Sequence, residues 1–285
     1  MVPAISIGGV DVLGRANSVK ASGGGRVQIE AEQRVILMDE LVEQIRNSGL
    51  KSGDTVVVHS SFRSLGILDP EEFIRALLAV LGDYGTLLMP SLSYQQEPPT
   101  IHNTNTTPSG VGFLSEYFRK RAGTVRSQHP THSVCGIGYK LHELLDTHRY
   151  DSTPCGPHSP FNKLFYQRGK ILMVGCGLKP NTSMHAIEEY VQPPYLFGAP
   201  TEYTITDAQG HTFHKTYLPH NFRGYVQRYD RVQDIVGDEG LQTSVIGKAQ
   251  VHLLNCEILF EKALVVLRKN PLYYVDIHEA AERHL

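Results

Sequence analysis

The chain has 285 residues, of which 41% are hydrophobic and 20% charged, and its formal net charge is -2. This length suits one large domain or a core with a smaller lobe. The near-zero charge argues against nucleic acid or an anionic membrane as the main partner. No apolar run approaches the roughly 20 residues of a membrane span, and the N-terminus lacks a secretion-signal pattern, so we expect a cytoplasmic protein.

The cysteine and histidine residues indicate which redox and metal chemistry the chain can support. Four cysteines lie far apart and form no CxxC pair, which fits reduced thiols better than a disulfide framework. They are Cys135, Cys155, Cys176 and Cys256. Several of the 14 histidines fall in polar or Gly/Pro-rich segments, so a metal site has to be considered.

The N-terminal part of the chain is expected to lie outside the core. Residues 21–25, ASGGG, resemble a linker, so we expect residues 1–26 to be a flexible segment and 27–285 a single domain. A helical pattern over 33–50 leads into a β-branched run at 55–59, which is typical of a strand buried on both faces of a parallel sheet.

A strand, helix, strand pattern follows. The loop 60–66 is rich in hydroxyl groups and comes after the carboxyl end of a strand, where open α/β sheets bind ligands. Asp69 and Pro70 open a helix that runs to about residue 81, and residues 85–90 form a second short apolar strand. This order predicts a doubly wound α/β fold.

The remaining segments are read in the same way. Residues 96–108 predict a long surface loop, residues 112–121 a helix with Phe113 facing inward, and residues 202–205 and 212–217 a hairpin. Further helices are expected at 141–148, 225–236 and 257–269, and strands at 134–139 and 249–254. We therefore predict a three-layer α/β/α fold with a mixed, largely parallel central sheet and a smaller lobe that contains the hairpin.

The stretch 169–189 is the most informative for chemistry. Residues 171–174 read as a buried strand, Gly175 and Gly177 break it, and residues 181–183 can cap a helix that carries His185 and Glu188. His185 and Glu188 are three residues apart and so lie on one face of the helix. The carboxylate could orient the imidazole or meet a cationic substrate. A solvated helix start explains this spacing equally well.

Five segments together resemble a known family. In chain order they read VHSSFRSLG (58–66), GTLLMPS (85–91), RSQHPTHSV (126–134), HSP (158–160) and GCGLKPNTSMH (175–185). This ordered set resembles the aminoglycoside 3-N-acetyltransferases, over about residues 35–267. The resemblance implies an α/β fold unrelated to the GCN5-like acetyltransferases and transfer of acetyl from acetyl-CoA to the 3-amino group of an aminoglycoside, with no metal.

The resemblance also implies site residues. His185 is the expected general base in a direct transfer, with Glu188 either holding it or attracting the amine. The coenzyme A residues are Ser60, Ser61, Phe62, Arg63, Ser64, Ser133 and Val134. The expected substrate residues are Tyr94, Glu188 and Glu189, with loops at about 95–110 and 190–225 around the acceptor.

Several alternatives remain open. His129 is a rival base, although a hydrogen-bonded loop histidine explains it better, and a zinc site through His129 and His132 lacks a further ligand at suitable spacing. His211, His214 and His220 are expected mostly at the surface. Cys176 is a conceivable acyl-carrying nucleophile, but its place between two glycines suggests selection for size.

The composition of the expected substrate loops bears on the acceptor. Aminoglycosides are polycationic, yet residues 96–108 carry only one carboxylate, Glu97, and the region after Tyr190 is aromatic and proline-rich. A less basic amine in biosynthesis is therefore an alternative, and so are a metal-assisted hydrolase and a non-catalytic coenzyme A-binding protein. We expect a small-molecule partner and neither nucleic acid nor membrane, and leave the oligomeric state open, with a homodimer considered.

Overall fold

The computed structural model describes residues 38–67, 69–95 and 97–277, all of which belong to one compact unit, Val35–Leu285. The predicted flexible segment 1–26, and its boundary with the domain, lie outside the described residues. Within the described part of the chain, no helix is both long and apolar enough to cross a membrane.

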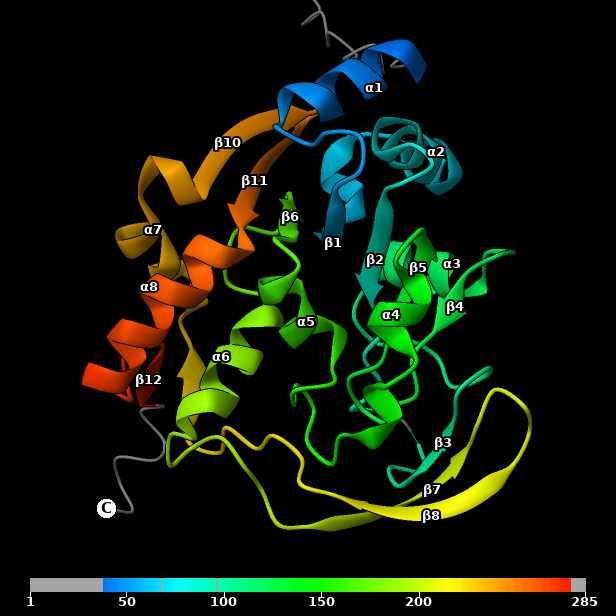
Figure 1. Ribbon diagram of the computed structural model, residues 1–285, viewed down its shortest axis with the longest axis vertical. Coiled ribbons are helices and arrows are strands. Elements are labelled where there is room, and N and C mark those ends of the chain that lie inside the picture. The colour runs from blue at the N-terminus through cyan, green and yellow to red at the C-terminus, as the bar shows by residue number, and fades with distance from the viewer. Residues whose placement is uncertain (1–37, 68, 96, 278–285) are drawn as a thin grey trace, which may run out of the picture. The chain divides into compact units, whose positions relative to one another are not determined.

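A seven-stranded mixed sheet forms the centre of the fold (Figure 1). Its order is β10 (Leu241–Ile246), β11 (Ala249–Asn255), β6 (Lys170–Val174), β1 (Thr55–Ser60), β2 (Thr86–Pro90), β5 (Val134–Gly138) and β4 (Val125–Arg126). The predicted α/β class with a mixed sheet is confirmed. Parallel pairing covers less of the sheet than expected, because only β1 pairs in parallel, with β2 and β6, and the flanking strands join antiparallel.

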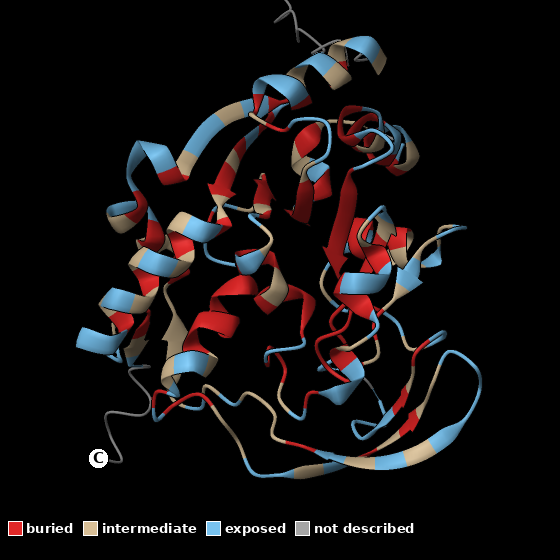
Figure 2. Ribbon diagram, viewed as in Figure 1, coloured by how far each residue is buried: buried red, intermediate tan, exposed pale blue. Residues whose placement is uncertain are grey.

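Helices cover both faces of this sheet, which confirms the three-layer prediction. The helices α1 (Met38–Asn47), α2 (Pro70–Leu81) and α3 (Phe113–Lys120) pack on one face. The other face carries α4 (Leu141–Leu145), α5 (Pro160–Tyr166), α6 (Ser183–Val191), α7 (Gln233–Gly240) and α8 (Cys256–Lys269). Alternate β1 side chains enter the two cores, Val57 on one side and Val56 and Val58 on the other. The central strands are therefore buried on both faces (Figure 2).

The start of α2 illustrates how local sequence fixes these elements. Asp69 precedes the helix, and its Oδ1 accepts a hydrogen bond from the backbone N–H of Glu71 at 2.8 Å. Pro70 occupies the first helical position, where a missing N–H costs nothing. The predicted cap is thus confirmed.

A second, three-stranded sheet joins two segments that are far apart in sequence. The predicted hairpin is confirmed as β7 (Thr201–Thr206) and β8 (Thr212–Tyr217), drawn in yellow in Figure 1. Within the expected loop 96–108, β3 (Ile101–Asn103) pairs in parallel with β7. The two segments predicted to surround the substrate are therefore held together by one sheet.

Three local predictions were wrong. The expected helix over 225–236 begins instead as β9 (Tyr225–Gln227), which pairs with β12 (Val275–Ile277), and continues through a 3₁₀ turn at Tyr229–Val232 before α7 begins. Phe113 is 61% exposed, because it is the first residue of α3 and packs sideways on Phe62. The helix expected to run to His148 ends at Leu145, and His148–Tyr150 form a separate 3₁₀ turn.

Candidate active site

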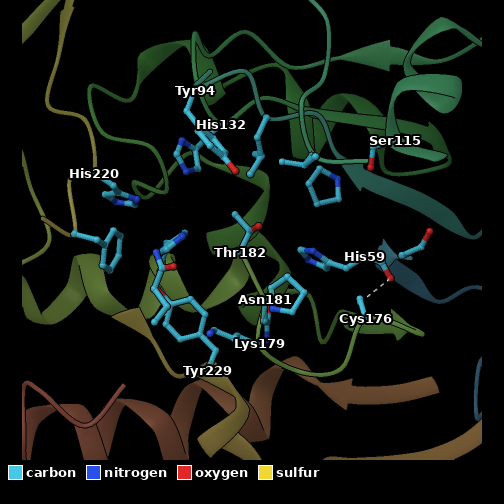
Figure 3. Close-up of a pocket in the computed structure, with 18 of the residues that line it drawn as sticks. His59, Tyr94, Ser115, His132, Cys176, Lys179, Asn181, Thr182, His220 and Tyr229 are labelled. Carbon is cyan, nitrogen blue, oxygen red and sulfur yellow. Dashed lines mark hydrogen bonds between the residues drawn. The ribbon is translucent and has the colours of Figure 1, made fainter. Parts of the chain in front are cut away.

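A cavity of about 540 Å³ opens where the three parallel strands end (Figure 3). His59 and Ser60 from the end of β1, Pro90 from β2, and Cys176 just after β6 form its sheet side. Loop residues form the opposite side: Tyr94, His132, His220, Phe222 and Tyr229. The cavity thus lies at the carboxyl ends of the strands, as the sequence predicts.

His185 lies in the first turn of α6 and lines this cavity. The turn is fixed by Asn181, whose Oδ1 accepts a hydrogen bond from the N–H of Ser183 at 3.2 Å. One turn further on, Glu188 is completely buried, and its Oε2 lies 2.9 Å from His185 Nδ1. The carboxylate therefore lies behind the imidazole and is not part of the cavity surface.

Two tyrosines complete the shell around Glu188. The hydroxyl of Tyr229 donates to Oε2 at 2.8 Å and lies 2.9 Å from His185 Nδ1, and that of Tyr195 donates to Oε1 at 2.8 Å. Burial and the nearby carboxylate raise the pKa of both phenols, so they remain hydrogen-bond donors. With both oxygens of Glu188 accepting, the neutral tautomer of His185 that fits these contacts has its proton on Nδ1 and its lone pair on Nε2.

His59 is a further imidazole of the cavity. It is the penultimate residue of β1, and burial, with His185 nearby, lowers its pKa to about 3, so the ring is neutral. Its Nε2 and the Oγ of Ser60 are buried and have no hydrogen-bond partner among the described residues. Buried polar atoms without partners are unusual and mark a place where a bound polar group fits.

His220 lines the cavity beside His185, with ring centroids 4.8 Å apart. The prediction of a surface position was wrong, because the segment bridges back to Phe197 and buries His220; His211 and His214 are exposed as expected. Its Nε2 lies 2.8 Å from Oε1 of Glu189. Burial lowers the pKa of His220 and raises that of Glu189 to about 7. A neutral imidazole that donates its Nε2–H to Glu189 fits this contact.

Glu189 itself does not line the cavity. Besides His220, its carboxylate accepts hydrogen bonds from the hydroxyl of Thr153 at 2.5 Å and the N–H of Cys155 at 2.7 Å. Its predicted link to the substrate can therefore act only through His220.

The histidines of the loop 129–132 have different surroundings. His129 accepts hydrogen bonds at Nδ1 from the N–H groups of Thr131 and His132, which confirms its interpretation as a hydrogen-bonded loop residue. His132 instead lines the cavity and contacts the hydroxyl of Thr131 through Nδ1 at 2.9 Å. Tyr94, which is 54% exposed, packs beside His132 with ring centroids 6.3 Å apart.

The turn after β1 contains most of the predicted coenzyme A residues. Of these, Ser60 lines the cavity. The N–H of Ser61 donates to the carbonyl of Val174, and Oγ of Ser64 donates to the carbonyl of Ser61. Phe62 is buried and Arg63 is exposed.

Gly175 lets this turn approach the strand β6. Its φ is +62°, and a Cβ there would lie 1.7 Å from Oγ of Ser64. Glycine is required for both the backbone conformation and the close contact.

Ser133 and Val134 lie behind the cavity. Oγ of Ser133 donates to the carbonyl of Ser91 and accepts from Nε of Arg126, both at 2.7 Å, while the N–H of Val134 donates to Ser127. Arg126 also donates to the carbonyls of Thr104 and Thr107. Ser133 and Arg126 therefore anchor the loop that carries Tyr94.

Besides His220, sequence reasoning missed His59, Tyr195 and Tyr229. His59 ends a predicted strand, and that position could have identified it. Tyr195 and Tyr229 carry no local signal, because they reach Glu188 from separate loops that only the fold brings together.

Comparisons with known proteins identify the family of the chain. A sequence profile described as Aminoglycoside 3-N-acetyltransferase matches residues 57–268. Aminoglycoside N(3)-acetyltransferase IV from Salmonella sp is 29% identical over 252 residues, covering 86% of this chain and 93% of the relative. The crystal structure of a histidine-to-alanine mutant of AAC(3)-IVa in complex with gentamicin has a TM-score of 0.76 at 28% identity, covering 88% of this chain and 96% of that one.

A third relative shares the fold at lower identity. AAC-IIIb, solved as a binary complex with CoASH, has a TM-score of 0.73 at 23% identity and covers 83% of this chain and 97% of its own. The profile match spans most of the chain, from residue 57 to residue 268. The chain therefore belongs to the aminoglycoside 3-N-acetyltransferase family.

Proposed function

We propose that this protein transfers acetyl from acetyl-CoA directly to an amino group, the 3-amino group of an aminoglycoside, with His185 as general base. The observation that carries the proposal is the buried contact between Glu188 Oε2 and His185 Nδ1 at 2.9 Å, behind an imidazole that lines the cavity. An imidazole nitrogen held in a fixed orientation beside a cavity is what proton removal from an amine needs.

The chemical step follows from this geometry. Nε2 of His185 accepts a proton from the acceptor amine as its nitrogen bonds to the acetyl carbonyl carbon. The carbon–sulfur bond breaks, and the proton passes on to the sulfur, so that CoASH and the amide leave. Glu188 stabilises the charged imidazolium without becoming protonated, and Tyr229 and Tyr195 hold that carboxylate in place.

The residues around the sheet end fit a coenzyme A thioester. The unpartnered Nε2 of His59 and Oγ of Ser60 supply polar atoms for its carbonyl or amide groups. Lys179, exposed at the cavity, and the N-terminal turn of α6 favour its phosphates. In this proposal Ser61, Phe62, Arg63 and Ser64 border the cofactor, while Ser133 and Val134 shape its channel from behind.

Direct transfer is favoured by the state of Cys176. This cavity residue is half-buried, and its thiol lies 3.7 Å from the carbonyl oxygen of His59 (Figure 3). Burial raises the pKa of the thiol, so the thiolate needed for an acyl-enzyme is scarce at neutral pH. Cys176 is then a donor in the wall of the cavity.

One observation favours a second acceptor class. Among the described residues that line the cavity there is no aspartate or glutamate, whereas His59, His132, His185 and His220 are present. Burial lowers the pKa of His59, His132 and His220, and a polycationic acceptor gains little from neutral imidazoles. A less basic amine that packs on Tyr94 and Phe222 is the alternative, with Glu189 acting through His220.

Release of CoASH from acetyl-CoA, measured with a thiol reagent across aminoglycosides and simple amines, tests the function. We expect turnover with an aminoglycoside and an acetylated product at its 3-amino group. Turnover with only weakly basic amines would select the second acceptor class. Absence of thiol release with every amine would contradict acetyl transfer.

A further inference from the structure

Three imidazoles converge at one end of the cavity. The rings of His132, His185 and His220 have centroid separations of 5.9, 5.3 and 4.8 Å, and one ring nitrogen of each lies within 4.8 Å of the others. In Figure 3, His132 and His220 lie together at the end opposite His59 and Cys176. Acetyl transfer as proposed uses only His185 of this group.

The hydrogen bonds leave one nitrogen of each ring uncommitted. His185 uses Nδ1 toward Glu188, and His132 uses Nδ1 toward the hydroxyl of Thr131. His220 uses Nε2 toward Glu189, and its Nδ1 is buried without a partner in the described structure. The nitrogens left as donors to a ligand are therefore Nε2 of His132, Nε2 of His185 and Nδ1 of His220.

The partners on the far sides of the rings match those of metal-binding histidines. Such histidines typically donate their other N–H to a carboxylate, hydroxyl or carbonyl, which fixes the ring and its tautomer. Glu188 and Glu189 are adjacent in sequence, and each binds a different imidazole of the trio. Two loops and the first turn of α6 thus present three oriented ring nitrogens to one place in the cavity.

The spacing is close to that of a tetrahedral site. With metal–nitrogen distances of about 2.0–2.1 Å, three ligand nitrogens of one ion lie about 3.3 Å apart. The present separations of up to 4.8 Å require the nitrogens to approach one another by up to about 1.5 Å, which small rotations of the side chains supply. Because all three residues line the cavity, a fourth position faces open space.

We propose that His132, His185 and His220 bind one divalent transition-metal ion of the Zn²⁺ class. Coordination through Nε2 of His185 occupies the lone pair that accepts the amine proton, so the bound ion inhibits acetyl transfer. This inhibitory consequence rests on the proposed function, whereas the metal site does not. The site also departs from the resemblance, which implies no metal.

Binding is measured first, without reference to activity. The full-length protein, freed of metal by chelation, is titrated with Co²⁺, whose visible absorption is intense when it is four-coordinate, and then with Zn²⁺. We expect about one Co²⁺ per chain, displaced by Zn²⁺. Absence of a four-coordinate spectrum in the wild-type protein would overturn the site.

Variants then locate the ion. His220→Asn and His132→Asn should each weaken binding by more than about 100-fold, beyond the effect of losing a group that only hydrogen-bonds a ligand. His214→Asn is the control, because this side chain is 64% exposed on β8. Circular dichroism verifies the fold of each variant. Retention of the Co²⁺ spectrum in a folded His220→Asn protein would also overturn the site.

Acetyl transfer is measured last, with and without the bound ion. Zn²⁺ at the concentration that saturates the site should reduce thiol release by the metal-free wild-type protein at least about tenfold, and a chelator should restore it. Unchanged turnover with the site saturated would overturn the inhibition. An intact Co²⁺ spectrum in a protein that shows no acetyl transfer at all would instead contradict the proposed function and leave the metal site standing.

Discussion

The two sides of the cavity are built in different ways. The sheet side consists of strand ends and the first turn of α6, whose positions follow from the central sheet: His59, Ser60 and His185. The loop side consists of segments held by side-chain contacts, among them Tyr94, His220 and Tyr229. The proposed general base, His185, belongs to the sheet side together with Glu188, whereas Tyr195 and Tyr229, which hold Glu188, come from the loop side. We therefore expect substitutions on the sheet side to change the rate of transfer, and substitutions on the loop side to change which amine is accepted.

Replacement of Glu188 breaks the link between the two sides and should have the largest effect. Glu188→Gln keeps the size of the side chain but cannot stabilise an imidazolium, so we expect kcat to fall by about 10²- to 10⁴-fold. Glu189→Gln is the matched control, since this neighbouring buried carboxylate does not contact His185. We expect less than about a tenfold loss there. Equal losses in steady-state thiol release would contradict the orienting role of Glu188.

Gly175 tests how tightly the sheet side is packed. Gly175→Ala adds a Cβ against Ser64 in a left-handed conformation, and should lower the free energy of unfolding by about 2–5 kcal/mol. Gly177→Ala is the control, because its φ is +64° but no atom lies within 4 Å of its Cβ position. There we expect about 1–2 kcal/mol from the backbone alone. Urea unfolding measures both, and equal losses would show that the contact with Ser64 is unimportant.

Two tyrosine variants test how the loop side orients His185 through Glu188. Tyr229→Phe removes the donor that contacts both Glu188 Oε2 and His185 Nδ1, and we expect kcat to fall about tenfold. Tyr195→Phe removes the donor to Oε1 alone, so we expect less than about a threefold loss. A larger effect of Tyr195→Phe would mean that His185 is oriented by another route.

Acid should lower the free energy of unfolding through the buried histidines. Burial lowers the pKa of His148, which stacks on His129, to about 3. The unfolded chain takes up this proton below about pH 6.5 and the folded chain only near pH 3, so stability is lost as the pH falls between them. Glu189 has its pKa raised to about 7, so its contribution to the free energy of unfolding increases, rather than decreases, as the pH falls from about 7 to 4.5.

The variant His148→Asn isolates this effect. The contribution of Glu189 is common to both proteins and cancels. The slope of unfolding free energy against pH below about pH 5.5 should be smaller in the variant by about 1.4 kcal/mol per pH unit. Urea unfolding between pH 6.5 and 4.5 measures it, and identical slopes would show that His148 is protonated in the folded protein.

The same division explains how far the sequence could predict the molecule. The strand at 55–59, the Asp69 cap and the helix that carries His185 follow from hydrophobic pattern and capping, which are local properties. Ser60 and Tyr94 were placed at the cavity because parallel strands end at one edge. Tyr195, Tyr229 and His220 were not predicted, because long-range packing of loops sets their positions. The pairing of β3 with β7 is non-local in the same sense.

The variant His185→Ala tests whether this imidazole removes the proton from the amine. Single-turnover acetyl transfer and coenzyme A binding are measured on the same metal-free preparation, with the wild-type protein alongside. We expect the rate of transfer to fall by about 10²- to 10⁴-fold, while the Kd for coenzyme A changes by less than about threefold. Near-normal transfer by this variant would show that another group removes the proton, and would contradict the assignment of His185 as general base.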